Sequence, residues 1–469
     1  MSLERLGRQN PWWENAELIN NDPHIVARDQ SPLKWSPEIR LKIKTEADLI
    51  YALRGPRQVG KTTLLKSLIR NLLRKKINPR RIIYIDCERL GSLNYLELSE
   101  VIEGYLNWIR TSESSRLYLF IDEINFIKDW AIGIKILADA GSLRNVFLIV
   151  TGSHAIDIKR GMERLPGRRG KEGSLDLLLL PMSFREYLSA LAPEIEAKLP
   201  QFETASLEEV AKIREALIYS SHLYPLFDNY LRSGGFPISA SEVSVHGSIP
   251  MYVFNIYKDA IISDLQHMGR KETLFRDLLS WIFNQRENPF DWTTAARESG
   301  IGKHDTARDY LEDAESAFAW FIIYRSRNIS RFVRSLRSPK KLVFMDPFIF
   351  HSLRTWSLGY SNPWEATIQF LQDPYNLGYL VESVVGSHLK RRFSNLAYWR
   401  NKLEIDFLVF REGGKVLPIE VKYQTRVGPR NQRAIHSTLK SGIILTRNFT
   451  AFDDQVISVP TPIFLSLLE

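Results

Sequence analysis

The sequence predicts an α/β fold class, with an open sheet in the N-terminal part of the chain. Short apolar runs there are separated by segments with helical periodicity, a pattern typical of strands joined by crossover helices. A glycine-rich loop lies between the first run and a helical pattern, and two acidic residues end the third run. Both features belong at the carboxyl edge of such a sheet, where open α/β folds bind ligands.

The first predicted strand, "DLIYAL" at 48–53, leads into a phosphate-binding loop. The loop reads "GPRQVGKT" at 55–62 and precedes the helical pattern "TLLKSLIRNLLRK", so the motif G-x-x-x-x-G-K-[ST] stands in the context it requires. Its glycines let backbone amides curl around phosphates, and the helix adds the positive end of its dipole. We expect Lys61 to reach the β- and γ-phosphates and Thr62 to ligate Mg²⁺. The residues expected to bind ATP or ADP are Gly55, Pro56, Arg57, Gln58, Val59, Gly60, Lys61, Thr62 and Thr63.

The second and third predicted strands are "RIIYIDCE" at 81–88 and "SRLYLFIDEI" at 115–124, and the third contains Asp122 and Glu123 near its end. We expect Asp122 to hold Mg²⁺ through water. Glu123 is expected to polarise the attacking water, as catalytic bases do in phosphoryl transfer. The structural alternative is a strand that ends at a solvated acidic turn.

The fourth predicted strand, "NVFLIVTGS" at 145–153, ends in hydroxyl-bearing residues, and Ser153 is expected to hydrogen-bond the γ-phosphate or the attacking water. A basic, glycine-rich stretch follows at 159–173. Arg168 or Arg169 in this stretch is a candidate arginine finger that enters the site of a neighbouring subunit. A solvated loop or a DNA-binding loop is the alternative.

The order of these motifs, namely the phosphate-binding loop, "FIDE", "TGS", "GRRG" and "LPMSFREYL" at 180–188, resembles the AAA+ class of ATPases. More narrowly, it is similar to a prokaryotic, chiefly archaeal, AAA+ family that also carries "YLxxGGFP", present as "YLRSGGFP" at 230–237. The resemblance covers nearly the whole chain after about residue 35. "NPWWE" at 10–14 is similar to archaeal members, although paired tryptophans more often serve packing than function.

This resemblance implies a helical lid, a winged-helix domain and a restriction-endonuclease-like α/β domain after the ATPase core. The expected boundaries are 1–35 for an N-terminal extension, 36–182 for the AAA+ P-loop core, 183–265 for the lid, 266–350 for the winged helix and 351–469 for the nuclease-like domain.

Within 272–345, three helical patterns precede a predicted β-hairpin at 321–346, which is the outline of a winged helix. The third helical pattern, "DTARDYLEDAESAF", is acidic where a major-groove reader would be basic, so we expect contacts to phosphates and not to bases. A packing spacer is the alternative. The cations expected at the hairpin tip are Arg327, Arg331, Arg334, Arg337, Lys340 and Lys341.

The C-terminal segment carries a second acidic pattern. A helix at 376–393 contains Glu382, and a hairpin at 396–424 contains Asp406 and then Glu420 and Lys422. Strand periodicity puts Glu420 and Lys422 on one face, with Asp406 opposite. The pattern resembles the PD-(D/E)xK nuclease core, which implies Mg²⁺ or Mn²⁺ held by Glu382, Asp406 and Glu420, with Glu420 and Lys422 catalytic. Solvated charges on a hairpin without a metal are the alternative.

The whole chain has 469 residues, a net charge of +9 and a pI near 9.3, which favours an acidic partner such as nucleic acid. Its single cysteine excludes a disulfide framework. The apolar runs are too short to span a membrane, and we expect a cytoplasmic protein. The predicted function is ATP hydrolysis that drives translocation, remodelling or branch migration of DNA in a homo-oligomer, in particular a ring, with metal-dependent cleavage left open. Two alternatives stand: a signalling or assembly switch with an inactive nuclease-like domain, and a nucleotide-regulated nuclease.

Overall fold

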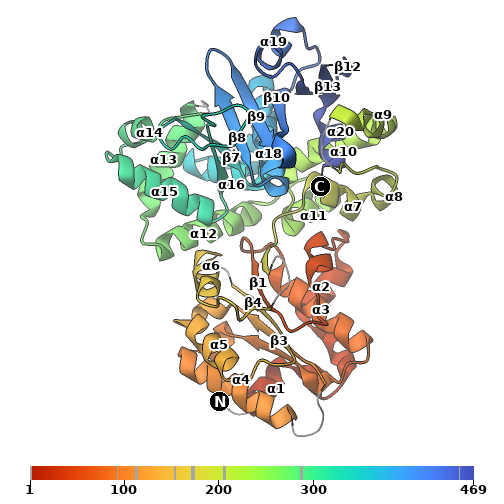
Figure 1. The fold of residues 1–469 in the computed structure, drawn as a ribbon, viewed down its shortest axis with the longest axis vertical. Coiled ribbons are helices and arrows are strands. Elements are labelled where there is room, and N and C mark those ends of the chain that lie inside the picture. The colour runs from red at the N-terminus through yellow and green to blue at the C-terminus, as the bar shows by residue number, and fades with distance from the viewer. Residues whose placement is uncertain are drawn as a thin grey trace. The chain divides into compact units, whose positions relative to one another are not determined.

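The computed structural model describes residues 3–91, 93–110, 115–152, 155–170, 175–203, 207–285, 289–453 and 455–468. The chain divides into two compact units, Met1–Leu180 and Pro181–Glu469 (Figure 1). The expected lid, winged-helix and nuclease-like segments all lie within the second unit. Among the helices of these described ranges, none is long and apolar enough to cross a membrane.

The first unit is built on a five-stranded parallel sheet in the order β2-β3-β4-β1-β5. This confirms the predicted α/β class, and the structure adds that the strands are parallel. The central strands are buried along their whole length, as apolar runs between helical layers must be. The strands are β1 Ile50–Arg54, β2 Ile82–Asp86, β3 Leu117–Asp122, β4 Val146–Thr151 and β5 Asp176–Leu178. The helices that follow β1 to β4 are α3 Lys61–Arg74, α4 Tyr95–Arg110, α5 Trp130–Asp139 and α6 Ala155–Glu163.

The strand order sets the position of the candidate site. After β1 the chain crosses to the far edge at β2 and returns through β3 and β4, so that β4 lies beside β1. Because all these strands are parallel, the carboxyl ends of β1, β3 and β4 meet at one edge. This edge is where a ligand binds in an open α/β sheet.

The edge strand β2 is covered by side chains of the N-terminal segment. Asn10 pairs with both backbone groups of Tyr84, accepting from its N–H at 2.6 Å and donating to its oxygen at 2.9 Å. The indole nitrogens of Trp12 and Trp13 both donate to the oxygen of Ile82, at 3.0 and 2.8 Å. The "NPWWE" segment therefore satisfies the backbone of an edge strand. The helices on either side of this segment are α1 Leu3–Gln9 and α2 Pro23–Gln30.

The second unit contains a six-stranded mixed sheet in the order β12-β13-β11-β10-β9-β8. The strands β8, β9 and β10 are antiparallel, so the predicted hairpin over 396–424 consists of three strands. Strands β10, β11 and β13 run parallel to one another. The bounds are β8 Leu396–Arg400, β9 Glu404–Phe410, β10 Val416–Lys422, β11 Gly442–Thr446, β12 Ala451–Phe452 and β13 Val456–Pro460.

Helices surround this sheet and form the rest of the second unit. Those before the two-stranded sheet are α7 Phe184–Leu191, α8 Pro193–Glu196, α9 Val210–Ala216, α10 Ser220–Ser233, α11 Pro237–His246, α12 Met251–His267, α13 Glu272–Gln285, α14 Trp292–Glu298 and α15 His304–Ser316. The antiparallel strands β6 Trp320–Tyr324 and β7 Lys340–Phe344 follow. The remaining helices are α16 Pro347–Ser357, α17 Pro363–Gln372, α18 Pro374–Arg392, α19 Pro429–Thr438 and α20 Thr461–Leu467.

The motifs "LPMSFREYL" and "YLRSGGFP" hold this unit together. The Phe184 N–H donates to Nε2 of His388 at 2.9 Å, and the Gly235 N–H donates to Oδ2 of Asp346 at 2.7 Å. The two motifs also meet directly, because the Met182 N–H donates to the Gly235 oxygen at 2.8 Å. A Cβ at Gly235 would lie 2.1 Å from the Met182 oxygen, so only glycine permits this approach. These contacts give both motifs a structural role.

The loop between β6 and β7 corrects one expectation about the hairpin. Lys340 and Lys341 are not at its tip, because they begin the buried strand β7. The loop itself is anchored on the C-terminal sheet, where the Ser326 N–H donates to the Tyr398 oxygen at 2.9 Å and the Tyr398 hydroxyl donates to the Pro339 oxygen at 2.5 Å. The expected tip cations that remain exposed are Arg327, Arg331, Arg334 and Arg337.

Candidate functional site

The phosphate-binding loop has the backbone that its sequence requires. A Cβ at Gly55 would lie 2.1 Å from the Leu179 oxygen, so a larger residue would push the loop away from the chain after β5. Gly60 precedes α3 with φ 101°, a left-handed conformation that favours glycine. The buried Lys61 ammonium donates to the oxygens of Gly55 and Pro56, at 3.0 and 2.9 Å. The loop thus curls around the cation at the N-terminus of a 14-residue helix, where anions are favoured.

Asp122 gathers hydroxyl groups from three neighbouring elements at the carboxyl edge of the sheet. Its Oδ2 accepts from Thr62 Oγ1 at 2.7 Å and from the Tyr84 hydroxyl at 2.9 Å. Its Oδ1 accepts from Thr151 Oγ1 at 2.5 Å. Asp122 is only 2% exposed, so these donors replace the water that a carboxylate needs. Burial and then the Asp122 charge raise the pKa of the Tyr84 hydroxyl, which therefore remains a donor.

Glu123 follows Asp122 in the left-handed conformation, with φ 49° and ψ 44°. A non-glycine residue held there marks a place where the surrounding fold fixes the backbone. The end of β4 lies close by, because a Cβ on Gly152 would meet Oδ1 of Asn125 at 1.6 Å. Ser153, the expected partner of the γ-phosphate, lies outside the described residues.

Sequence reasoning missed Tyr84 and Asn125 at this edge. The available signal for Tyr84 was its place near the end of the strand "IIYID", beside the strand that carries Asp122. The signal for Asn125 was its position two residues after the acidic pair.

The two candidate finger arginines are paired within their own chain. Arg168 forms an ion pair with Asp139 and donates through Nη1 to the Pro166 oxygen at 3.1 Å. Arg169 pairs with Asp176 at 2.9 Å and donates to the Ile50 oxygen at 3.2 Å. The Arg168 side chain is 31% exposed and that of Arg169 is 15% exposed. Arg168 is therefore the more accessible of the two.

The predicted C-terminal residues come together around a buried lysine that was not predicted there. The Lys341 Nζ lies 2.8 Å from Glu382 Oε1, 3.0 Å from Glu404 Oε1 and 2.9 Å from Asp406 Oδ1. The Lys422 Nζ lies 2.6 Å from Glu420 Oε1 and 3.9 Å from Asp406 Oδ2. All six side chains form one network, which we call the C-terminal charge cluster.

Three members of the C-terminal charge cluster, Glu382, Glu404 and Lys422, line a pocket of about 480 Å³. Burial, followed by the Asp406 charge, raises the pKa of Glu420 to about 8. Burial alone would lower the pKa of Lys341, but the surrounding carboxylates raise it well above its usual value. The Mg²⁺ or Mn²⁺ expected here does not fit, because an ammonium already stands between the carboxylates. Among the described residues no group of three or more His, Cys, Asp or Glu is arranged to hold a metal ion.

Comparison with known families assigns the first unit. Residues 47–188 match a family described as an AAA domain. This part of the chain is therefore similar to AAA domains. It contains the phosphate-binding loop, Asp122 and Glu123, and the fold class predicted for this part is thereby confirmed. AAA domains bind nucleotide and use Mg²⁺, and the Thr62 hydroxyl beside the Asp122 carboxylate supplies the oxygen ligands that this cation prefers.

The segments beyond the AAA domain match families without an assigned function. Residues 224–360 match the domain of unknown function DUF8612, and residues 377–464 match the domain of unknown function DUF4143. An uncharacterized protein of Haemophilus influenzae is 21% identical over 388 residues, which are 81% of this chain and 84% of that protein.

Solved structures similar to this chain include the Walker-type ATPase PABY2304 of Pyrococcus abyssi, with a TM-score of 0.40 and 15% identity over 67% of this chain and 93% of that chain. The RuvB Holliday junction branch migration motor of Thermotoga maritima has a TM-score of 0.26 and 16% identity over 73% of this chain and 92% of that chain.

Proposed function

We propose that the AAA domain hydrolyses ATP with Lys61, Thr62, Asp122 and Glu123 as its working residues. The observation that carries this proposal is the direct hydrogen bond of 2.7 Å between Thr62 and Asp122, which joins the phosphate-binding loop to the acidic strand end. On binding ATP, the Lys61 ammonium exchanges its two carbonyl partners for phosphate oxygens, which carry more negative charge. Mg²⁺, when bound, supplies positive charge to the phosphate oxygens.

Glu123 is the proposed general base of this reaction. Its carboxylate accepts the proton of the attacking water, while Asp122 holds the Thr62 hydroxyl in place through their hydrogen bond. The backbone of Glu123 is left-handed, a conformation that the surrounding fold must hold in place. Thr151 and Tyr84 orient Asp122 through their hydroxyls.

We propose that the energy of hydrolysis is used on DNA, through a winged helix over 266–350 that contacts phosphates. Four arginines of its loop are exposed, and the chain carries a net charge of +9. Such arginines give affinity for a phosphate backbone that does not depend on sequence. They are Arg327, Arg331, Arg334 and Arg337.

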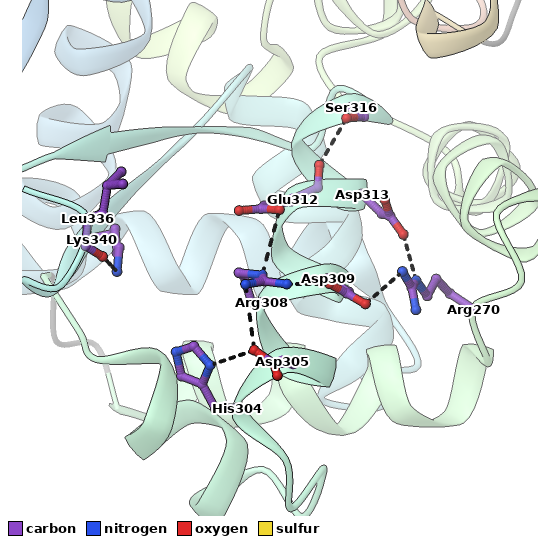
Figure 2. A network of polar contacts seen from close by, with 10 residues as sticks. All are labelled: Arg270, His304, Asp305, Arg308, Asp309, Glu312, Asp313, Ser316, Leu336 and Lys340. Carbon is purple, nitrogen blue, oxygen red and sulfur yellow. Dashed lines mark hydrogen bonds and ion pairs between the residues drawn. The ribbon is translucent and has the colours of Figure 1, made fainter. Parts of the chain in front are cut away.

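Helix α15, in the place of a recognition helix, is unsuited to read bases. It carries five acidic residues against one arginine. Arg308 forms ion pairs with Asp305, Asp309 and Glu312 of the same helix (Figure 2). Arg270, which lies before this helix in the chain, also pairs with Asp309. The surface of α15 is therefore negative, and its one cation is already paired. This favours binding to DNA without sequence preference.

We propose a head-to-tail oligomer, such as a ring, in which Arg168 enters the site of the next subunit. Its partner Asp139 is half exposed, at 48%, and ion pairs at such surfaces are weak enough to exchange. Mixing Arg168→Ala protein with Lys61→Ala protein tests this arrangement. Partial recovery of ATPase activity is expected in the mixture, and a monomer with no recovery at any ratio would exclude it.

The decisive experiment measures the ATPase rate without DNA and with duplex, single-stranded or branched DNA. We expect stimulation by DNA that is lost when the loop arginines are neutralised. A rate indifferent to every DNA would instead favour the second candidate, a nucleotide-dependent assembly switch. The internal ion pairing of the C-terminal charge cluster favours that candidate's inactive nuclease-like domain.

A further inference from the structure

We infer that Lys341 is a resident cation that takes the place of a divalent metal in the C-terminal charge cluster. In its unaltered form the second unit accordingly binds neither Mg²⁺ nor Mn²⁺ at Glu382, Asp406 and Glu420. The unit is held together there by an ammonium supplied from β7, a strand outside the segment that carries the acidic pattern.

The distances leave no place for a second cation among these carboxylates. The Lys341 ammonium donates to Glu382 and Asp406 at 2.8 and 2.9 Å, and Glu404 forms an ion pair with it at 3.0 Å, so three carboxylates surround one cation. Oxygen ligands of Mg²⁺ stand about 2.0–2.1 Å from the metal, so the ion would need the space that Nζ fills. The Lys341 side chain is 1% exposed, so water does not compete for it.

The strand that carries Lys341 is fixed to the helix that carries Glu382. The Phe344 N–H donates to the Ser383 hydroxyl at 2.6 Å, and the Ser387 hydroxyl donates to the Met345 oxygen at 2.7 Å. These bonds anchor β7 along α18. The rings of Tyr398 and Phe407 flank the ammonium, at 5.8 and 5.6 Å from Nζ. The backbone that carries Lys341 is thereby held beside the carboxylates.

Glu420, the third residue of the expected metal-ligand set, also has protein partners on both carboxylate oxygens. Glu420 Oε1 is paired with the Lys422 ammonium at 2.6 Å, and its Oε2 accepts the Asp406 N–H at 3.2 Å. Asp406 Oδ2 accepts the Val421 N–H at 2.9 Å. Each member of the expected metal-ligand set therefore has a protein partner within hydrogen-bonding distance. The lysine of the nuclease-like pattern, Lys422, is paired as well, because its ammonium contacts Glu420.

The test measures Mn²⁺ binding to the full chain by electron paramagnetic resonance, without nucleotide. We expect the unaltered protein and Asp406→Asn to bind equally little Mn²⁺. Lys341→Ala should melt at a lower temperature, because it leaves buried carboxylates without their cation. It should also gain about one Mn²⁺ per chain, because acidic oxygens then surround an empty position. Adding Asp406→Asn to Lys341→Ala should abolish that gain.

Lys340→Ala is the matched control. Lys340 is the neighbouring buried lysine of β7, but its Nζ donates to the Leu336 oxygen and lies 4.3 Å from the centre of the Trp292 ring, away from the carboxylates. It should gain no Mn²⁺. The inference is overturned if the unaltered chain binds Mn²⁺ in a way that Asp406→Asn removes, or if folded Lys341→Ala gains none. The comparison of the unaltered chain with Asp406→Asn tests the inference even where Lys341→Ala does not fold.

Discussion

Acidification should destabilise the second unit through two buried histidines. His388 donates from Nδ1 to the Val384 oxygen at 2.8 Å and accepts the Phe184 N–H on Nε2 at 2.9 Å, so a proton on Nε2 would break the second bond. His351 donates from Nε2 to the Leu231 oxygen at 2.9 Å. Burial, and then a neighbouring arginine in each case, lowers both pKa values from 6.5 to about 3.

The sign and size of the effect follow from these pKa values. The unfolded chain takes up protons below pH 6.5 that the folded chain takes up only near pH 3, so stability present above pH 6.5 is lost as the pH falls. At about pH 5 each histidine costs about 2 kcal/mol of the free energy of unfolding, or about 4 kcal/mol for both.

Urea unfolding followed by tryptophan fluorescence, near neutral pH and near pH 5, measures this loss. His351→Gln and His388→Gln should each reduce the dependence of the unfolding free energy on pH. His246→Gln is the control, because the His246 side chain is 65% exposed. If both buried-site variants keep the full pH dependence of the parent, the histidines do not remain neutral in the folded chain and the reasoning fails.

Three further outcomes test the proposed function. Glu123→Gln should still bind ATP in an equilibrium titration, but it should hydrolyse ATP at least about a hundredfold more slowly, because the general base is lost. Hydrolysis at the parental rate would exclude this role. Tyr84→Phe should lower the free energy of unfolding by about 1.5–3 kcal/mol, because Asp122 loses a buried donor, and an unchanged urea midpoint would contradict it. Neutralising Arg331, Arg334 and Arg337 together should weaken binding to all DNAs alike and flatten the salt dependence by about one unit per lost contact, whereas a strong preference for one sequence would refute phosphate binding.

The parts of the site that the sequence predicts are those set by local pattern. The strand, the glycine loop, Lys61 and the Asp122–Glu123 pair follow one another within short segments, where strand and helix periodicity are informative. Tyr84 was not predicted as a partner of Asp122, because 38 residues separate the two and only the pairing of β2 with β3 brings them together.

The position of Lys341 was also not predicted, because its partners are even farther away in the sequence. It is 65 residues from Asp406 and stands next to Lys340 after a run of arginines, so its charge was assigned to an exposed loop tip. The signal against that interpretation was the apolar run "LVF" directly after it, which marks the start of a buried strand. A buried strand rarely contains a lysine that has no carboxylate partner.

The covering of β2 by Asn10, Trp12 and Trp13 limits how copies of this chain can join. Sheets in separate subunits fuse when two open edges exchange backbone hydrogen bonds. On the β2 side those backbone groups are already bonded to amide and indole side chains of the same chain. A continuous sheet running from one subunit to the next cannot form there without displacing them. Subunits that assemble therefore do not pair their sheets through backbone hydrogen bonds at this border.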